Sequence, residues 1–295
     1  VVKEGPTTAV LDGNNGMGQV IGTKAMGMAI DKAEKYGMGM VAVRNSNHYG
    51  IAGYYALMAA EKGMIGMTGT NARPSIAPTF GTENMLGTNP LTFGMPTDEA
   101  FPFVLDCATS IAQRGKIEVY SRQGKQLPEG WVIGKDGKPR TDTEQVLKDL
   151  VTGGAALAPL GGIGEDLAGY KGYGYATVVE ILSAALQGGR FLKALSGMDH
   201  GKKVQYHLGH FFLAINVEAF ISLEEFRKTT GDILRELRAS RKAPGEERIY
   251  TAGEKEYLAW QFRKDKGVPV NVSLQKDLIA LKKDLNLTQY HFEFE

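Results

Sequence analysis

One histidine, His48, stands at a predicted strand-to-helix corner in a chain that has only five histidines. The apolar run 39–43 before it is typical of a buried strand, and residues 51–60 after it recur apolar at helical spacing. Gly63 is placed to end that helix. An imidazole gives and takes protons near neutral pH, so a histidine at this corner could act as a general acid and base. A surface or capping histidine is the alternative.

Cys107 is the only cysteine, and it lies between a predicted strand and a predicted helix start. Such a position can lower the pKa of a thiol and create a nucleophile. A thiol-dependent acyl-transfer enzyme with His48 as its base is therefore one alternative function, and a metabolite-binding protein without turnover is another. A single cysteine also excludes an internal disulfide and favours a reducing, cytoplasmic location.

Standard cofactor and metal motifs are not found in the sequence. The glycines 16, 18 and 22 have the wrong final spacing for a G-x-G-x-x-G dinucleotide fingerprint, and no G-x-x-x-x-G-K-[ST] phosphate loop occurs. His207-x-x-His210 resembles a metal-binding pair, but it lies at a predicted strand start, where residues three apart face opposite sides. We therefore predict a structural role for this pair and no metal site.

The elements that must position these residues alternate between strands and helices. With 295 residues, 23% charged residues and a net charge of +1, the composition favours neither nucleic-acid nor membrane binding, and no apolar run approaches the length of a membrane span. We predict an α/β body over residues 1–221. Ser222-x-x-Glu225 has the pattern of a capping box and opens a mainly helical C-terminal part over residues 222–295.

Four local predictions concern element boundaries. A helix is expected over residues 23–36 with Thr23 as its cap, and another over residues 175–186. The turn-rich segment 124–140 is expected to be an exposed excursion. Thr141-x-x-Glu144 is expected to cap a short helix.

Five motifs, in order, resemble the type-2 malate/L-lactate dehydrogenase family. They are N-S-N-H-Y-G (45–50), L-G-T-N-P (86–90), L-D-C-A-T-S (105–110), A-Q-R-G-K (112–116) and G-Y-K-G-Y-G (169–174). The likeness runs from Leu11 to about Leu287. It implies an NAD(P)-dependent oxidoreductase that interconverts 2-hydroxy and 2-oxo acids, with malate and oxaloacetate as the expected pair. It also implies a non-Rossmann dinucleotide-binding fold with a helical C-terminal part, and a homodimer or larger homo-oligomer.

The resemblance assigns roles to individual residues. His48 matches the catalytic histidine, and Thr88 and Asn89 are expected to line the substrate pocket. Asp106 could instead cap the helix that follows it, and Lys171 could be an ordinary surface lysine. The expected contacts with NAD or NADP are discontinuous: Asn71, Ala72, Asp106, Cys107, Ala108, Pro159, Leu160, Lys171, Pro244, Gly245 and Glu246.

One family feature has no counterpart in this sequence. The family places a serine, histidine and arginine motif in an N-terminal helical segment, where the arginine grips the substrate carboxylate as a bidentate partner. The sequence starts at Val1, downstream of such a segment. Either this segment is omitted here or the protein binds its acid differently. We expect that the segment is omitted and that it packs with the helical C-terminal part. Residues 162–168 resemble a short insertion that could reshape the cleft entrance.

Overall fold

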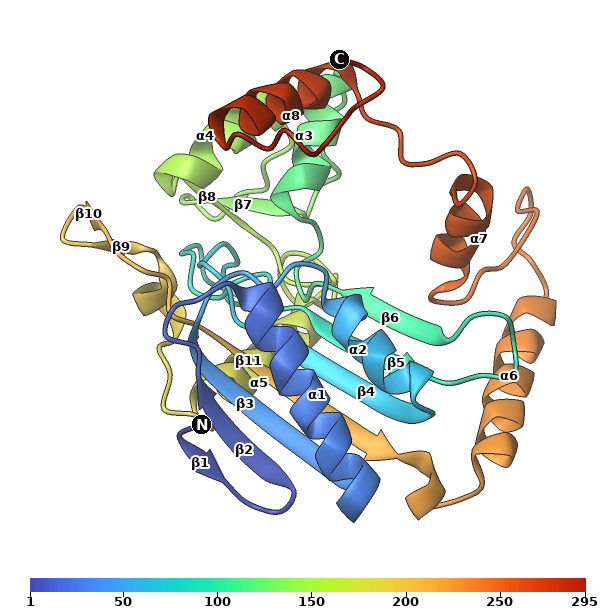
Figure 1. The fold of residues 1–295 in the computed structure, drawn as a ribbon. Helices are drawn as coiled ribbons and strands as arrows, with labels where there is room; N and C mark the ends of the chain where they lie inside the picture. The colour runs from blue at the N-terminus through green and yellow to red at the C-terminus, as the bar shows by residue number, and fades with distance from the viewer. The chain divides into compact units, whose positions relative to one another are not determined.

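A seven-stranded mixed sheet organises the first part of the chain in the computed structural model, which describes residues 1–295 apart from the side chain of Ser273 (Figure 1). The strand order is β1-β2-β3-β11-β4-β5-β6, and only β2 and β3 pair in parallel within this sheet. The strands are β1 (Lys3–Glu4), β2 (Thr8–Asp12), β3 (Met38–Ser46), β4 (Met64–Thr70), β5 (Leu91–Met95), β6 (Phe103–Cys107) and β11 (Leu208–Asn216).

Helices cover both faces of this sheet. α1 (Gly18–Tyr36) and α2 (Ala52–Glu61) pack on one face, and α5 (Gly169–Ala184) packs on the other (Figure 1). The central strand β11 is apolar on both sides because both of its faces are covered. Its Phe212 belongs to the core cluster that includes Met26 and Tyr55, and the neighbouring Phe211 is equally buried.

A second, smaller layer forms from α3 (Arg114–Arg122), β7 (Val132–Gly134), α4 (Thr143–Thr152) and β8 (Ala155–Leu157). The prediction that residues 124–140 are an exposed excursion is wrong for the middle of that segment. Its apolar side chains Leu127 and Val132 are buried in the cluster around Ile117 and Leu157, because β7 pairs with β8.

Three helix starts differ from the predictions. The cap of α4 is Asp142, whose Oδ1 accepts a hydrogen bond from Gln145 N at 3.0 Å, so the proposed capping box at Thr141 is wrong. α1 begins five residues before Thr23. α5 begins at Gly169, before Tyr175, because its glycines let the helix approach the 159–161 loop: a Cβ on Gly172 would lie 2.2 Å from Leu160 O.

α6 (Leu223–Ala239) completes the compact unit Val1–Gly253. Ser222 caps this helix, since its Oγ accepts from Glu225 N at 3.3 Å and donates to Glu225 Oε2 at 2.7 Å. Arg235 of α6 binds both carboxylate oxygens of Asp98, at 2.9 and 3.0 Å, which ties the helix to the turn between β5 and β6.

A second compact unit, Glu254–Glu295, holds α7 (Glu254–Arg263) and α8 (Val272–Asp284). Asn271 caps α8 by accepting from Leu274 N at 3.0 Å. The predicted domain division at residue 221 stays a prediction. Short elements complete the chain: β9 (Met198–Asp199), β10 (Lys202–Lys203), and the 3₁₀ helices η1 (Leu192–Leu195) and η2 (Val217–Ala219). None of the helices in the described part of the chain has the length and apolar character that a bilayer crossing requires.

Candidate active site

His48 lies in the turn between β3 and α2, so the predicted strand-to-helix corner is confirmed. Its side chain is exposed, and its Nδ1 accepts a hydrogen bond from Gly50 N at 3.2 Å. Gly50 has a φ of +81°, a conformation that favours glycine and brings its N–H back to the ring. Because Nδ1 accepts, the proton of the neutral ring lies on Nε2 in this arrangement, and Nε2 makes no hydrogen bond to the described residues.

A buried aromatic pair supports this turn. The ring of Tyr49 stacks on the ring of His210 with centroids 4.7 Å apart and planes 12° apart, and Tyr55 Oη donates to Tyr49 O. His210 Nδ1 pairs with Thr70 Oγ1 at 2.7 Å, and burial lowers the pKa of His210 to about 3. His210 is therefore neutral at physiological pH, and its ring packs against Tyr49, the residue that follows His48.

The other histidine of the H-x-x-H pair has a different partner. His207 Nδ1 lies 3.1 Å from Asn45 Oδ1, so the two histidines contact different parts of the segment around His48. Their side chains do not converge on one point. Among the described residues, no three His, Cys, Asp or Glu side chains come together as a metal site would require.

Asp106 contacts the N-terminus of α2, the helix that follows the His48 turn. Its Oδ2 accepts from Gly53 N in the first turn of α2 at 2.7 Å, and its Oδ1 accepts from Thr92 Oγ1 at 3.1 Å. The alternative that Asp106 caps the following helix is wrong, because α3 begins only at Arg114. α2 has Ile51 at its own cap position, so a carboxylate 53 residues away supplies the missing acceptor. No local signal in the sequence could have indicated this pairing.

Cys107 lacks the environment of an activated thiol. Its side chain is partly buried, and burial, together with the charge of Asp106, raises the pKa of the thiol. Its Sγ lies 3.9 Å from Leu91 O, an acceptor that favours the protonated thiol. The electrostatics therefore argue against the thiolate that an acyl-transfer reaction would need.

Three of the predicted cofactor-binding segments lie side by side. Leu160 N donates to Thr109 O at 2.8 Å, which joins the segment after Asp106 and Ala108 to the Pro159–Leu160 loop. The backbone of Leu160 in turn touches Gly172, so Lys171 in the first turn of α5 is next to that loop. Lys171 is exposed, with its Nζ 5.8 Å from the centre of the Tyr170 ring.

Asn71 and Asn89 are buried, and the side-chain amide of each makes two hydrogen bonds. Asn71 Oδ1 accepts from Gly209 N at 2.8 Å, and its Nδ2 donates to Arg190 O at 3.2 Å. Asn89 Nδ2 donates to Ala176 O at 3.0 Å and to Glu180 Oε2 at 2.8 Å.

The backbones beside these two asparagines are also fixed. Thr88 O accepts from Thr109 N at 2.9 Å, and a Cβ on Gly87 would lie 2.5 Å from Ala72 O. Glu180, to which Asn89 is bonded, was not singled out from the sequence.

Pro244, Gly245 and Glu246 form an exposed turn after α6, in which Glu246 N donates to Ala243 O at 3.1 Å. The chain returns from this turn to the sheet edge, where Val104 N donates to Ala252 O at 3.3 Å. None of the hydrogen bonds described for the chain joins this turn to the other predicted cofactor contacts.

Comparisons with known proteins define the class. The sequence matches the malate/L-lactate dehydrogenase family over residues 1–279. The chain belongs to this family, and it is a dehydrogenase of 2-hydroxy acids.

Individual relatives are named for the acids on which they act. The malate dehydrogenase of Pyrococcus abyssi is 50% identical over 270 residues, which cover 92% of this chain and 72% of the relative. The L-sulfolactate dehydrogenase of Methanocaldococcus jannaschii is 40% identical over 295 residues, covering 97% and 78%. The crystal structure of malate dehydrogenase from Entamoeba histolytica matches with a TM-score of 0.91 at 51% identity, covering 96% of this chain and 78% of that one.

Proposed function

We propose that the protein interconverts malate and oxaloacetate with a nicotinamide dinucleotide, and that His48 moves the proton. The choice of acid is supported by relatives named malate dehydrogenase at 50% and 48% identity, which are more similar than the sulfolactate and ureidoglycolate dehydrogenases at 40% and 30%. The observation that carries the proposal is the exposed His48 ring, which accepts a hydrogen bond from Gly50 N at Nδ1. The turn that holds it packs on the stacked, buried rings of Tyr49 and His210.

The chemistry requires one proton and one hydride for each turnover. When bound, the nicotinamide would supply the hydride to C2 of the oxo acid. In the reduction direction the imidazolium form of His48, which has given up the Gly50 contact at Nδ1, gives its Nε2 proton to the carbonyl oxygen as that oxygen becomes an alcohol. The neutral ring that remains carries its proton on Nδ1, and its Nε2 takes the proton back in the oxidation direction. The N-terminus of α2 follows the His48 turn, and its positive end stabilises negative charge developing on the oxygen.

The residues present fit a dinucleotide. Asp106 is exposed, and a carboxylate with one bond on each oxygen has lone pairs left for ribose hydroxyls. The exposed Lys171, at the start of α5, suits a phosphate group. We propose that Asn71, Ala72, Cys107, Ala108, Pro159, Leu160 and the turn at Pro244, Gly245 and Glu246 complete the contacts.

We propose a non-Rossmann binding mode for this dinucleotide. A single parallel pair in the seven-stranded sheet supports this, because the Rossmann crevice is formed by parallel strands. Relatives in Escherichia coli named ureidoglycolate dehydrogenase (NAD(+)) favour NAD over NADP.

For substrate binding, Thr88 is the better of the two predicted donors. Asn89 uses its amide N–H groups on Ala176 and Glu180, which leaves its Oδ1 as the atom without a partner among the described residues. We propose that Thr88 lines the substrate pocket and that Asn89 shapes it.

We further propose a cytoplasmic homodimer or larger homo-oligomer. The exposed side of α5 carries Tyr175, Val178 and Ile181, each about half exposed, which supports a covered face in an assembly. Sedimentation that finds only monomer would contradict the oligomer.

The function is tested with a panel of 2-oxo acids and both reduced cofactors, following nicotinamide absorbance. We expect the highest kcat/KM for oxaloacetate with NADH. A clear preference for pyruvate or sulfopyruvate would overturn the choice of acid, and binding of NADH without turnover of any 2-oxo acid would favour a non-catalytic metabolite-binding protein.

A further inference from the structure

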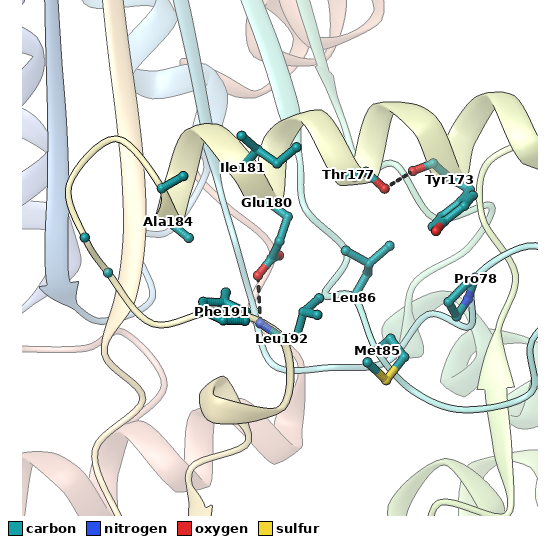
Figure 2. A pocket seen from close by; sticks show the side chains of 13 residues that line it. Pro78, Met85, Leu86, Tyr173, Thr177, Glu180, Ile181, Ala184, Phe191 and Leu192 are labelled. Carbon is teal, nitrogen blue, oxygen red and sulfur yellow. Dashed lines mark hydrogen bonds between the residues drawn. The ribbon is translucent and has the colours of Figure 1, made fainter.

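Glu180 is a buried carboxylate for which the proposed reaction has no use. It lies in α5 with 6% of its surface exposed, at the wall of a cavity of about 510 Å³. The cavity is otherwise lined mainly by apolar side chains, among them Leu86, Ile181 and Phe191, and Figure 2 shows the Glu180 carboxylate turned toward Leu192 N. A carboxylate in such surroundings needs a reason, because burying a charge costs stability.

Every described partner of this carboxylate is a hydrogen-bond donor. Oε1 accepts from Leu192 N and Oε2 accepts from Asn89 Nδ2, both at 2.8 Å. Burial outweighs these two donors and raises the pKa of Glu180. Asn71 is linked to the same place through the backbone, since its Nδ2 donates to Arg190 O at 3.2 Å, two residues before Leu192. Only an acceptor-only group satisfies this set, and a carboxylate is such a group.

These contacts lead to loops that the proposed function uses. Asn71 follows β4 in the predicted cofactor loop, and Asn89 lies beside Thr88 in the predicted substrate loop. Thr88 O accepts from Thr109 N, so the position of this loop is transmitted to the segment that follows Asp106. One carboxylate on α5 is therefore the common anchor of parts of the chain that are distant in sequence.

We infer that Glu180 is a positioning residue that fixes the Asn89 loop relative to the segment 190–192 and, through Arg190 O, relative to Asn71. This inference rests on the proposed function, since those loops bind cofactor and substrate only if that function holds. An apolar residue of similar size would leave Leu192 N and one N–H of Asn89 without an acceptor at a buried site. The carboxylate therefore holds these two segments in one geometry.

The test uses Glu180→Gln, Asn89→Asp and the double variant. In Glu180→Gln the new amide presents N–H groups where an acceptor is needed, so one of its two bonds is lost. In the double variant that amide can donate to the carboxylate at position 89, which restores the pair in reverse. The matched control is Thr177→Val, which lies on the same helix and lines the same cavity but bonds only to Tyr173 O, at 2.9 Å.

We expect Glu180→Gln to lower kcat/KM for oxaloacetate by roughly 10- to 100-fold, the range for a lost hydrogen bond to a charged group. KM and the Kd for NADH should rise, since both loops move. The double variant should recover part of the loss, and Thr177→Val should behave like the wild type. The measurements are steady-state kinetics, NADH fluorescence titration and thermal unfolding of each protein.

Unchanged kinetics and NADH affinity in a folded Glu180→Gln protein would overturn the inference, even if its melting temperature fell. So would a double variant that shows only the sum of the single losses. If Glu180→Gln does not fold, Asn89→Ala removes the same bond from the other end and is judged by the same criteria. If the wild type turns over no 2-oxo acid, the proposed function fails, and the NADH Kd values still decide the inference.

Discussion

The His48 turn and the Glu180 cluster place polar side chains in opposite surroundings. His48 is exposed, and only Nδ1 is held, by one backbone N–H. Glu180 is 6% exposed, and each of its oxygens is held by a donor. A group that exchanges protons with a substrate needs a free atom and access, whereas a group that positions loops needs full engagement. The comparison separates the residue proposed to do the chemistry from the residue proposed to position the loops.

Of the two regions, the exposed His48 turn should give the largest loss of activity when its histidine is replaced. His48→Ala should lower kcat by roughly 10²- to 10⁴-fold, the contribution of a positioned acid–base group, with little change in fold or NADH Kd. Near wild-type turnover in His48→Ala would sink the proposed mechanism. Stopped-flow kinetics and fluorescence titration provide both readouts.

Disturbing the packing of α5, the helix that carries Glu180, should lower the stability of the fold. Gly172→Ala would place a Cβ 2.2 Å from Leu160 O, so α5 must move away from the 159–161 loop, at a cost of about 3 kcal/mol in unfolding free energy. Gly174→Ala is the matched control, because no atom lies within 4 Å of its added Cβ. There the higher helix propensity of alanine should stabilise by up to about 1 kcal/mol. Urea unfolding measures both; equal effects would refute the packing argument.

Asp106 lies between the two cases, being exposed yet engaged. Asp106→Ala removes the acceptor for Gly53 N and should cost about 1 kcal/mol, the usual value of a lost helix cap. Asp106→Asn keeps an acceptor and should recover most of that stability. If the carboxylate also binds ribose, both variants should raise the Kd for NADH. Unchanged Kd in both would leave Asp106 as a cap alone.

The exposed ion pair between Arg235 and Asp98 should contribute less to stability than the Gly172 packing or the Asp106 cap. Arg235 lowers the pKa of Asp98 below its usual 3.8, so the pair stabilises the fold above that pH and the stabilisation is lost as pH falls through the lowered pKa. The melting temperatures of the wild type and Asp98→Asn should therefore differ slightly at neutral pH and converge in acid. Glu236→Gln, on an exposed part of the same helix, serves as the control. A difference that persists in strong acid would contradict the assignment to this charge.

The smallest effect should come from Cys107. Because burial raises the pKa of its thiol, alkylation by iodoacetamide at neutral pH should be slow, and Cys107→Ser should keep kcat within about twofold. Rapid alkylation with loss of turnover, while NADH still binds, would instead support the thiol-dependent alternative.

Local signals predicted much of the fold. The apolar run at β3, the strand start near His210, the left-handed glycine at Gly63 and the Ser222 cap all correspond to observed elements, because each depends on residues within a few positions. The burial of Leu127 was missed because turn residues surround it. Its apolar partners, such as Ile117, are supplied by other elements.

The sequence predicted candidate members of the site, which stay predictions, and did not predict the contacts that these residues make. Family motifs indicated His48, Asp106 and Asn89, but sequence alone does not indicate that Asp106 caps α2 or that Asn89 bonds to Glu180. Both contacts join residues dozens of positions apart, and glutamate in a helix is ordinary by composition. Such contacts are determined by how α2 and α5 pack on the sheet.

The place of β11 has a consequence for how the chain is made. It pairs with β3 on one side and β4 on the other, so the sheet has no continuous centre until residues 208–216 exist. During synthesis, β3 and β4 must each wait for over a hundred residues with an open edge, and open edges are where strands from other chains add. Chains that stop short of residue 208 should aggregate on the ribosome or soon after release. The strand at the centre of the finished sheet is therefore its last piece to be made.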